Sequence, residues 1–349
     1  MSKEGRKTGK KLLATGSIRT VEKDDSVSRK NPVLYWFPGS FNSGKATLAM
    51  QLSSRSKDCT LKKILHMKDN YTPEYARLNP DTMAVPTLEI DDKVCTDSYD
   101  LCLYLMEHYP GSGDQALKKE DNKEEALLDW INLCSSWDEY MYTYGHQSQS
   151  QADMANSIRL FHLRKNLDTV LSDHPNDMNF LVDCYVTKIA GVTVMKRAME
   201  EGTQKDNKMK ENKLLLDQLL AKGNELLKKN GGKSFLFGEE LTTGDVFFLP
   251  IFRIFALATP NMFEQVYTKY PKLKTYWEKA KKNIDVKQGL LDCVLPHRMI
   301  FTMFSHHVPF LLLSYKLGFM SAQPELPEEI EKRITELTKV KWDEVCAGE

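Results

Sequence analysis

The pattern of apolar residues changes character about a third of the way along this 349-residue chain. Between residues 31 and 110, short β-prone runs alternate with stretches of helical spacing, whereas from about residue 122 onward the apolar residues follow only the helical period. An alternating strand–helix segment followed by helices alone predicts a small α/β domain and a separate all-helical domain. The length agrees with two domains, because one domain usually takes roughly 100–200 residues.

The α/β segment begins with a strand that ends at Pro38-Gly39, and a tight hairpin at Asp91-Asp92 joins its last two strands. This order gives a strand, a helix, a strand, a hairpin and a helix. The predicted elements are strands at 33–37, 61–65, 86–90 and 93–95 and helices at 45–52 and 98–108.

The charge composition excludes one class of function. Lys and Arg together number 48 and Asp and Glu together number 48, which argues against a nucleic-acid-binding protein that acts through overall charge. Seven cysteines without a CxxC motif do not form a disulfide framework, so we expect reduced thiols in an intracellular protein. The N-terminus lacks the apolar segment of a secretory signal.

Residues 1–31 are basic, polar and without an apolar pattern, which predicts a disordered tail. A mitochondrial presequence is the weaker interpretation of this tail, because Glu4 and further acids at 22, 24 and 25 interrupt it.

A hydroxyl-rich turn, Ser40-Phe41-Asn42-Ser43, lies between the first strand and the first helix. A thiolate at this position would meet backbone N–H groups and the positive end of the helix. A serine hydroxyl there can donate a hydrogen bond to the thiolate and favour its charged form. The alternative is an ordinary helix-capping turn without chemistry.

A proline opens the third predicted strand, in Val85-Pro86-Thr87-Leu88. A cis Val85–Pro86 bond would turn the Val85 N–H and C=O toward a cleft, where an extended peptide could pair with them as an added strand. The alternative is a trans proline at the start of an edge strand. Further on, Asp97-Ser98 opens the next helix, whose N–H groups can bind a carboxylate or simply be capped.

A fourth pattern concerns folding. Thr242 and Asp245 form a capping-box variant before the apolar run 246–257, which contains Pro250. This run predicts the buried central helix of the helical domain, kinked at its proline.

Taken in order, these patterns resemble the glutathione transferase family over roughly residues 32–292. Its cis-proline motif is similar to the stretch from Pro73 to Leu88, its acid-serine motif to Thr96-Asp97-Ser98, and its C-terminal capping box to 238–245. The resemblance implies a thioredoxin-like N-terminal domain plus an all-α C-terminal domain, with a long helical insert at about 142–234.

The resemblance also implies glutathione as co-substrate, no metal, and conjugation to an apolar electrophile. Ser40, alone or with Ser43, would stabilise the thiolate, and Val85 before Pro86 would pair with the cysteinyl backbone. Asp97 would hold the γ-glutamyl ammonium and Ser98 its carboxylate. Met83 and Ala84 offer no partner for the glycyl carboxylate, and Trp137, Met141 and Tyr144 are candidates for the electrophile pocket.

Within the family, Ser40 to Lys45 and the long insert resemble the ganglioside-induced differentiation-associated protein 1 branch, whose members sit in the mitochondrial outer membrane. Two functions therefore stay open: a glutathione-conjugating enzyme, or a non-catalytic protein of outer-membrane organisation or scaffolding. A homodimer stays open too. We expect a cytoplasmic protein, with the mitochondrial outer-membrane surface as the alternative.

The C-terminal region departs from that branch. Residues 299–315 have no Asp, Glu, Lys or Arg but are short for a membrane span, and the acidic, helical segment 321–349 follows them. We expect a buried or interfacial helix here, and membrane association through 294–320 stays open. The predicted units are a tail at 1–31, an α/β domain at 32–110, a helical domain at 120–292 and an extension at 293–349.

Overall fold

A computed structural model gives the fold. It describes residues 17–20, 31–117, 123–139, 142, 149–173, 178–201, 205–258, 262–291 and 323–347.

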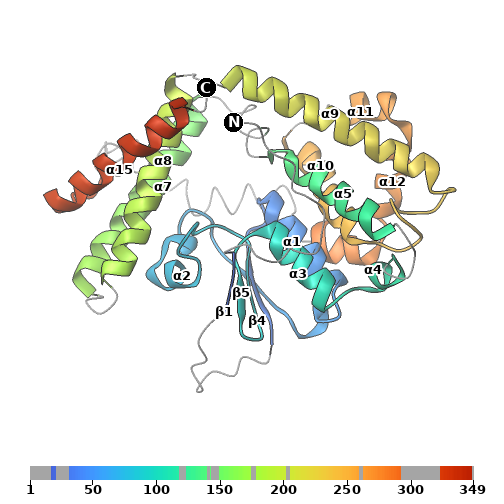
Figure 1. The fold of residues 1–349 in the computed structure, drawn as a ribbon, viewed down its shortest axis with the longest axis horizontal. Coiled ribbons are helices and arrows are strands. Elements are labelled where there is room, and N and C mark those ends of the chain that lie inside the picture. Colours follow the sequence, from blue (N-terminus) through green and yellow to red (C-terminus); the bar gives the residue numbers. More distant parts are fainter. Residues whose placement is uncertain are drawn as a thin grey trace.

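A five-stranded sheet forms the centre of the N-terminal domain (Figure 1). The strands lie in the order β1-β5-β4-β2-β3, and β2 pairs with β3 in parallel while the other neighbours are antiparallel. The parallel pair needs a crossover connection, which the first helix supplies. The strands are β1 (Ile18–Thr20), β2 (Val33–Trp36), β3 (Thr60–Lys63), β4 (Thr87–Ile90) and β5 (Lys93–Cys95).

Strand β1 corrects one expectation. It lies within the predicted disordered tail, yet Ile18 is paired with Cys95 and the Arg19 guanidinium donates to the Leu78 carbonyl at 2.6 Å. The prediction of a disordered tail is therefore wrong at residues 17–20, because pairing with β5 supplies hydrogen bonds that no local pattern indicated. The rest of the tail lies outside the described residues.

The helices of this domain agree with the sequence pattern, and the first one begins earlier than predicted. Ser40 caps it, since its hydroxyl accepts the Ser43 N–H at 3.1 Å, and the helix therefore includes the hydroxyl-rich turn. The elements are α1 (Phe41–Leu52), η1 (Ser56–Asp58), η2 (Asp69–Tyr71), α2 (Pro73–Leu78), α3 (Ser98–His108) and α4 (Ser112–Leu117).

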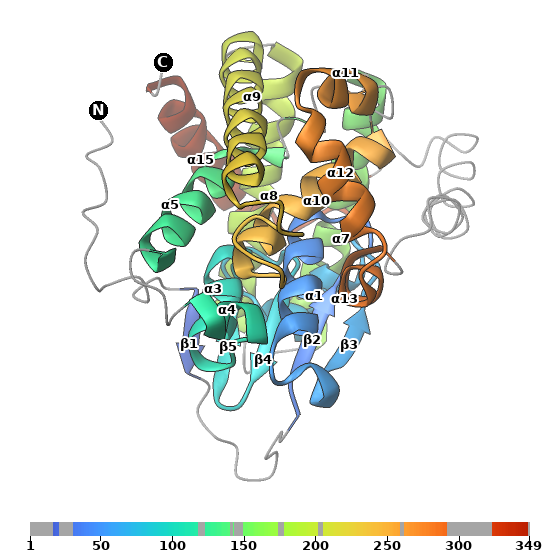
Figure 2. The ribbon, with the colours of Figure 1, turned by 90° about the vertical axis from the view of Figure 1, so that its right-hand side faces the viewer.

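The remaining described chain is helical, and Figure 2 shows α9 and α12 side by side above the sheet domain. These helices are α5 (Lys123–Ser136), α7 (Gln149–Asp173), α8 (Met178–Glu201), α9 (Lys205–Lys229), α10 (Thr243–Ala258), α11 (Met262–Lys269), α12 (Pro271–Ala280), α13 (Ile284–Val286), the π-turn η3 (Lys287–Leu291) and α15 (Glu328–Ala347). The two-domain architecture, a thioredoxin-like domain followed by a helical domain, is thus confirmed.

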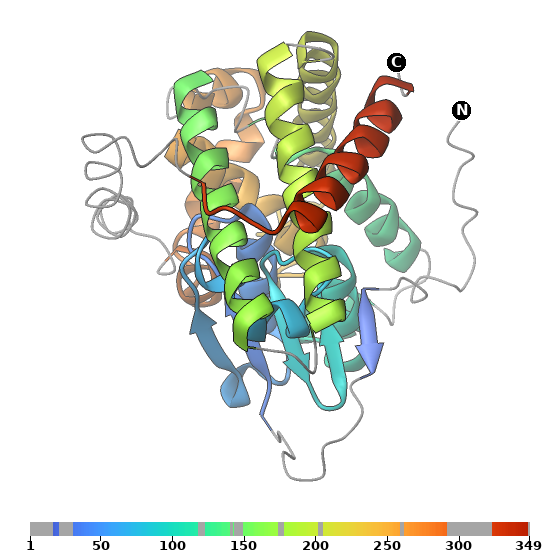
Figure 3. The same cartoon turned by 90° about the vertical axis from the view of Figure 1, so that its left-hand side faces the viewer.

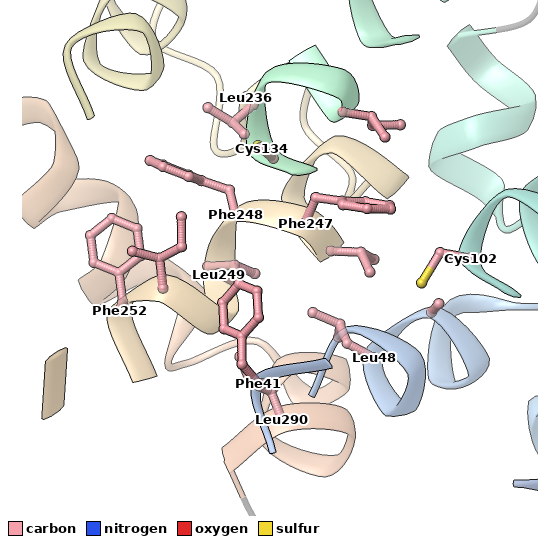
Figure 4. Packing of buried hydrophobic residues seen from close by; sticks show 14 of the residues in the cluster. Phe41, Leu48, Cys102, Cys134, Leu236, Phe247, Phe248, Leu249, Phe252 and Leu290 are labelled. Atoms are coloured by element: carbon pink, nitrogen blue, oxygen red, sulfur yellow. The ribbon is translucent and has the colours of Figure 1, made fainter. Parts of the chain in front are cut away.

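The main core lies where α1 and α3 pack against α10 (Figure 4). Helix α10 is the predicted buried helix and contains Pro250. Its Phe248 ring packs edge-on against Trp130, with ring centres 5.0 Å apart. The capping box is present as well, because the Thr242 N–H and hydroxyl both donate to the Asp245 carboxylate, at 3.0 and 2.9 Å. A buried aromatic core of this kind joins the two domains firmly.

A second core lies on the other flank of the sheet domain (Figure 3). Helices α7, α8 and α15, here called the side bundle, share an apolar cluster with Tyr71, Ala76 and Met83 of the N-terminal domain. The acidic C-terminal extension is therefore helical, as expected, and it packs on α8. The segment 293–322, with its uncharged stretch, lies outside the described residues, and none of the described helices has the length and hydropathy to cross a bilayer.

Candidate functional site

The three segments singled out in the sequence meet at the start of α1. The Ser98 hydroxyl, at the start of α3, donates to the Asn42 side-chain carbonyl at 3.0 Å. Val85 packs in a small apolar cluster with Phe37, and the Phe37 N–H donates to the Ser43 hydroxyl at 3.2 Å. The hydroxyl turn, the cis-proline loop and the start of α3 therefore form one site.

Ser40 and Ser43 play different parts in the turn. The Ser43 side chain is fully buried and accepts the Phe37 N–H, so it shapes the turn from the inside. Ser40 is half-buried, and its oxygen accepts the Ser43 N–H. A hydroxyl has one proton to donate, and within the described chain the Ser40 proton has no acceptor. Ser40 can therefore donate a hydrogen bond to a ligand.

The Val85–Pro86 peptide bond is cis, as the pattern predicted. The carbonyls of the three residues before Val85 each accept a hydrogen bond from a side chain of a different segment. Lys188 of α8 donates to the Thr82 carbonyl, Asn70 donates to the Met83 carbonyl at 2.7 Å, and Tyr75 of α2 donates to the Ala84 carbonyl at 2.7 Å. The loop is thus fixed by two domains.

Val85 itself is left available. Among the described residues, its backbone N–H and C=O take part in no sheet, turn or loop hydrogen bond. Strand β4 starts two residues later, at Thr87. A free amide and carbonyl on one residue next to a sheet is the arrangement that pairs with an added peptide strand.

Asp97 and Ser98 complete the site at the start of α3. Asp97 is exposed and caps the helix, with one carboxylate oxygen accepting the N–H groups of Tyr99 and Asp100 at 2.8 and 3.2 Å. Its other oxygen has no partner within the described chain, so it can accept from an ammonium group. The Ser98 side chain is buried, and its oxygen can still accept a hydrogen bond.

The sequence reasoning missed a polar link between the domains. Asn42, which receives the Ser98 hydroxyl, donates its own amide to the Glu139 carboxylate at 2.5 Å. Burial raises the pKa of Glu139, and the charge of Lys45 opposes this shift. The Lys45 ammonium lies 4.8 Å from the centre of the Phe41 ring. No sequence spacing connects Asn42 with Glu139, which are 97 positions apart, so only the tertiary structure could reveal this link.

Lys188 is a second residue that the sequence did not assign to the site. Desolvation, with a smaller contribution from the charge of Arg159, lowers its pKa to about 8. The Lys188 side chain is half-buried, and its ammonium group donates to the Thr82 carbonyl. The sequence places Lys188 106 positions away from Thr82, on a helix of the predicted insert.

Only part of the predicted electrophile pocket can be assessed. Trp137 is buried in the main core, edge-on to Phe41 with ring centres 5.5 Å apart, while Met141 and Tyr144 lie outside the described residues. No group of three or more potential metal ligands occurs in the part of the chain that the structure describes.

Comparison with protein families gives two matches. Residues 34–113 match the model of the glutathione S-transferase N-terminal domain, and residues 188–288 match the model of the C-terminal domain. The chain belongs to the glutathione S-transferase family. The two matches occur in the family's order, together cover just over half of the chain, and leave all of α7 and α15 outside.

One curated relative is a tetrachloro-p-hydroquinone reductive dehalogenase from Sphingobium chlorophenolicum, 30% identical over 120 residues. The match spans 34% of this chain and about half of the relative, 46% of its length. This partial match leaves the activity of the whole protein undecided.

Two similar solved structures are members of the transferase family. A glutathione S-transferase from the clam Laternula elliptica is 20% identical, with a TM-score of 0.41, and the match covers 74% of this chain and 92% of that one. A transferase family member from Pseudomonas fluorescens, solved with two glutathione bound, is 15% identical, with a TM-score of 0.41 and the same coverages, 74% and 92%.

Proposed function

We propose that this transferase-family protein binds glutathione and conjugates it to an apolar electrophile. The observation that carries the proposal is the unpaired backbone of Val85 at a cis-proline, together with the Ser40 hydroxyl proton, which has no acceptor among the described residues. In this arrangement the cysteinyl residue of glutathione pairs with Val85, and its sulfur lies against Ser40 at the start of α1.

The γ-glutamyl end binds at the start of α3. Its ammonium group is attracted to the free oxygen of Asp97, and its carboxylate meets the N-terminus of α3, where helix N–H groups and the helix dipole favour an anion. The Ser98 hydroxyl is already fixed by Asn42, so it orients the site without further ordering.

The glycyl carboxylate needs a different partner from the one that most glutathione sites supply. The Met83 side chain is fully buried in the side-bundle cluster, and Ala84 has no polar side chain. His66 is a basic residue close to the cis-proline loop. Its ring stacks on Phe37, with ring centres 5.3 Å apart, and Phe37 packs against the apolar cluster that contains Val85. We assign it to the glycyl end.

In the reaction, the glutathione thiol loses its proton to solvent, and the Ser40 hydroxyl stabilises the resulting thiolate by donating a hydrogen bond. The thiolate then attacks the electrophilic carbon and forms the new carbon–sulfur bond, while the bond from that carbon to its leaving group breaks and the leaving group departs into solvent with the electron pair. Pro86 keeps Val85 in place, and Ser43 keeps the turn closed.

The test is glutathione titration followed by thermal unfolding. A ligand at 100 times its dissociation constant should add about 2.7 kcal/mol of stability. Ser40→Ala should lower conjugation of a model electrophile on the order of 100-fold while most of the binding remains. Ser136→Ala, which removes an exposed hydroxyl of α5, is the matched control and should change neither.

Conjugation that survives Ser40→Ala unchanged would contradict the catalytic assignment. No stabilisation at millimolar glutathione would favour the second candidate function, a non-catalytic protein of outer-membrane organisation or an interaction scaffold. The buried Met83, which leaves the glycyl end without a partner in its own loop, is the observation in favour of that candidate.

The branch, location and assembly are proposals of the same kind. The long helical insert supports placement in the ganglioside-induced differentiation-associated protein 1 branch, and with it the mitochondrial outer-membrane surface in place of the cytoplasm. Cell fractionation with a carbonate wash tests the location. Light scattering of the full chain tests a homodimer.

A further inference from the structure

One helix and the turn that follows it carry a net positive charge. Residues 271–287, which span α12, α13 and the first residue of η3, contain six lysines and two acids, although the whole chain has equal numbers of basic and acidic residues. The inner side of α12 is apolar, with Leu273, Tyr276 and Trp277 buried. The lysines therefore project outward.

Three of these lysines form a stripe without an ion-pair partner among the described residues. Lys272, Lys279 and Lys282 are exposed and follow the helical spacing along one face of α12 and its end. No carboxylate of the described residues lies within 4 Å of any of them, whereas the neighbouring Lys281 is paired with Glu278 at 2.7 Å. A row of unpaired ammonium groups creates a positive surface potential.

An exposed apolar side chain lies beside this stripe. Ile284 is 59% exposed and begins α13, between Lys282 and Lys287. The turn that presents it is fixed, because the Asn283 side-chain carbonyl accepts the N–H groups of Asp285 and Val286 at 2.8 and 3.2 Å. The exposure of Ile284 is thus a property of an ordered turn.

The opposite charge lies at the other end of the molecule. Residues 323–347, which include α15, contain seven acids and four bases. Figure 1 shows α15 and α12 on opposite sides of the molecule. The charge separation would turn the α12 side toward an anionic surface and α15 away from it.

We propose that α12 and α13 form a docking surface for the anionic headgroups of a phospholipid bilayer. Lysines bind the headgroups, and an isoleucine between them can enter the boundary between headgroups and acyl chains. Nucleic acid fits this surface less well, because the aromatic side chains of α12, Tyr276 and Trp277, are buried and offer no face for base stacking. This inference does not depend on the proposed transferase function.

The experiment measures sedimentation of the full chain with vesicles of phosphatidylcholine alone or with added phosphatidylserine. Each lysine near an anionic surface contributes about fivefold to binding, so K272Q/K279Q/K282Q should weaken binding to phosphatidylserine vesicles on the order of 100-fold. The control K332Q/K339Q/K341Q on α15 removes the same charge from the opposite end and should leave binding unchanged. Ile284→Asn should weaken binding at high salt, where the lysines are screened.

Equal binding to both vesicle types, or binding that survives the α12 variant unchanged, would overturn the proposal. Binding of that surface to a single-stranded oligonucleotide but not to phosphatidylserine vesicles would also overturn it. Circular dichroism and thermal unfolding of each variant test whether the fold is retained. We expect that it is, because all the substituted lysines are exposed or partly exposed. Glutathione titration of the α12 variant should give the wild-type result.

Discussion

The N-terminal domain has two neighbours, and they hold it in different ways. On one flank, α1 and α3 share a large aromatic core with α10. On the other flank, the side bundle shares a smaller apolar cluster and adds two polar contacts, from Tyr185 to the Tyr71 carbonyl and from Lys188 to the Thr82 carbonyl. The first contact holds the two domains together, whereas the second reaches the loop that presents Val85.

The largest effect is expected in the aromatic core. Phe248→Ala removes a fully buried ring and should lower the free energy of unfolding by about 3–5 kcal/mol, measured by denaturant unfolding. Leu181→Ala in the side bundle, also fully buried, is the matched comparison. Hydrogen exchange of Leu181→Ala should then show loss of protection in the side bundle only, in α7, α8 and α15. If Leu181→Ala unfolded α1 and α10 as well, the two cores would be a single cooperative unit.

The carboxyl of Asp245 gives a pH-dependent test of the aromatic core. Burial raises its pKa to about 6, against hydrogen bonds from Leu236, Thr242 and Tyr276 that favour the ionised form. The carboxyl of Asp245 therefore stays protonated to a higher pH in the folded chain than in the unfolded chain. Because of this difference, the free energy of unfolding falls as the pH rises from about 4 to 6. A shift of about two units corresponds to roughly 3 kcal/mol.

The measurement is the unfolding free energy of the wild type minus that of Asp245→Asn, at several pH values. This difference should decrease across the window and then stay level, because the asparagine does not titrate. An increase with pH would show that the hydrogen bonds outweigh the burial and that the pKa is lowered.

The polar contacts of the side bundle should have a smaller effect. Tyr185→Phe removes a buried hydrogen bond to the Tyr71 carbonyl, 2.5 Å away, at a cost of about 1 kcal/mol. Tyr99→Phe, at an exposed hydrogen bond to Asn132, is the control and should cost less. Glutathione affinity should fall only for Tyr185→Phe, because Tyr71 lies in the same cluster as Met83.

The smallest effect is expected at the surface of the side bundle. Arg333 of α15 pairs with Asp183 of α8, and both side chains are largely exposed. Exposed ion pairs usually contribute less than about 1 kcal/mol, so Arg333→Gln should shift the denaturation midpoint only slightly. A large shift would mean that charge, and not the apolar cluster, holds α15 in place.

Much of the fold could be predicted from local pattern. The strands at 33–36, 87–90 and 93–95 and the helix at 98–108 agree with their periodicity and turn residues, and Val85–Pro86 is cis. The hydroxyl turn and the start of α3 meet through the hydrogen bond from Ser98 to Asn42. The ligand roles of Ser40, Val85 and Asp97 stay predictions.

Other parts could not be predicted because their partners are distant in the sequence. Strand β1 exists through pairing with β5, and its three residues are too few to show an alternating pattern. Asn42 and Glu139 are 97 positions apart, and Lys188 reaches Thr82 across 106. Ser43 shows the opposite case, since its sequence position suggested a ligand contact while packing buries it inside the turn.

The sequence by itself determined the elements, because apolar period, capping residues and prolines act within a few residues of each other. It also indicated the candidate residues for chemistry at the start of α1 and before the cis-proline. Only the tertiary structure decided that the side bundle fixes the Val85 loop and that the α12 lysines remain unpaired. Both depend on which surfaces pack together. The hydrophobic effect that drives this packing is non-directional, so it joins residues that are far apart in the sequence without a local pattern.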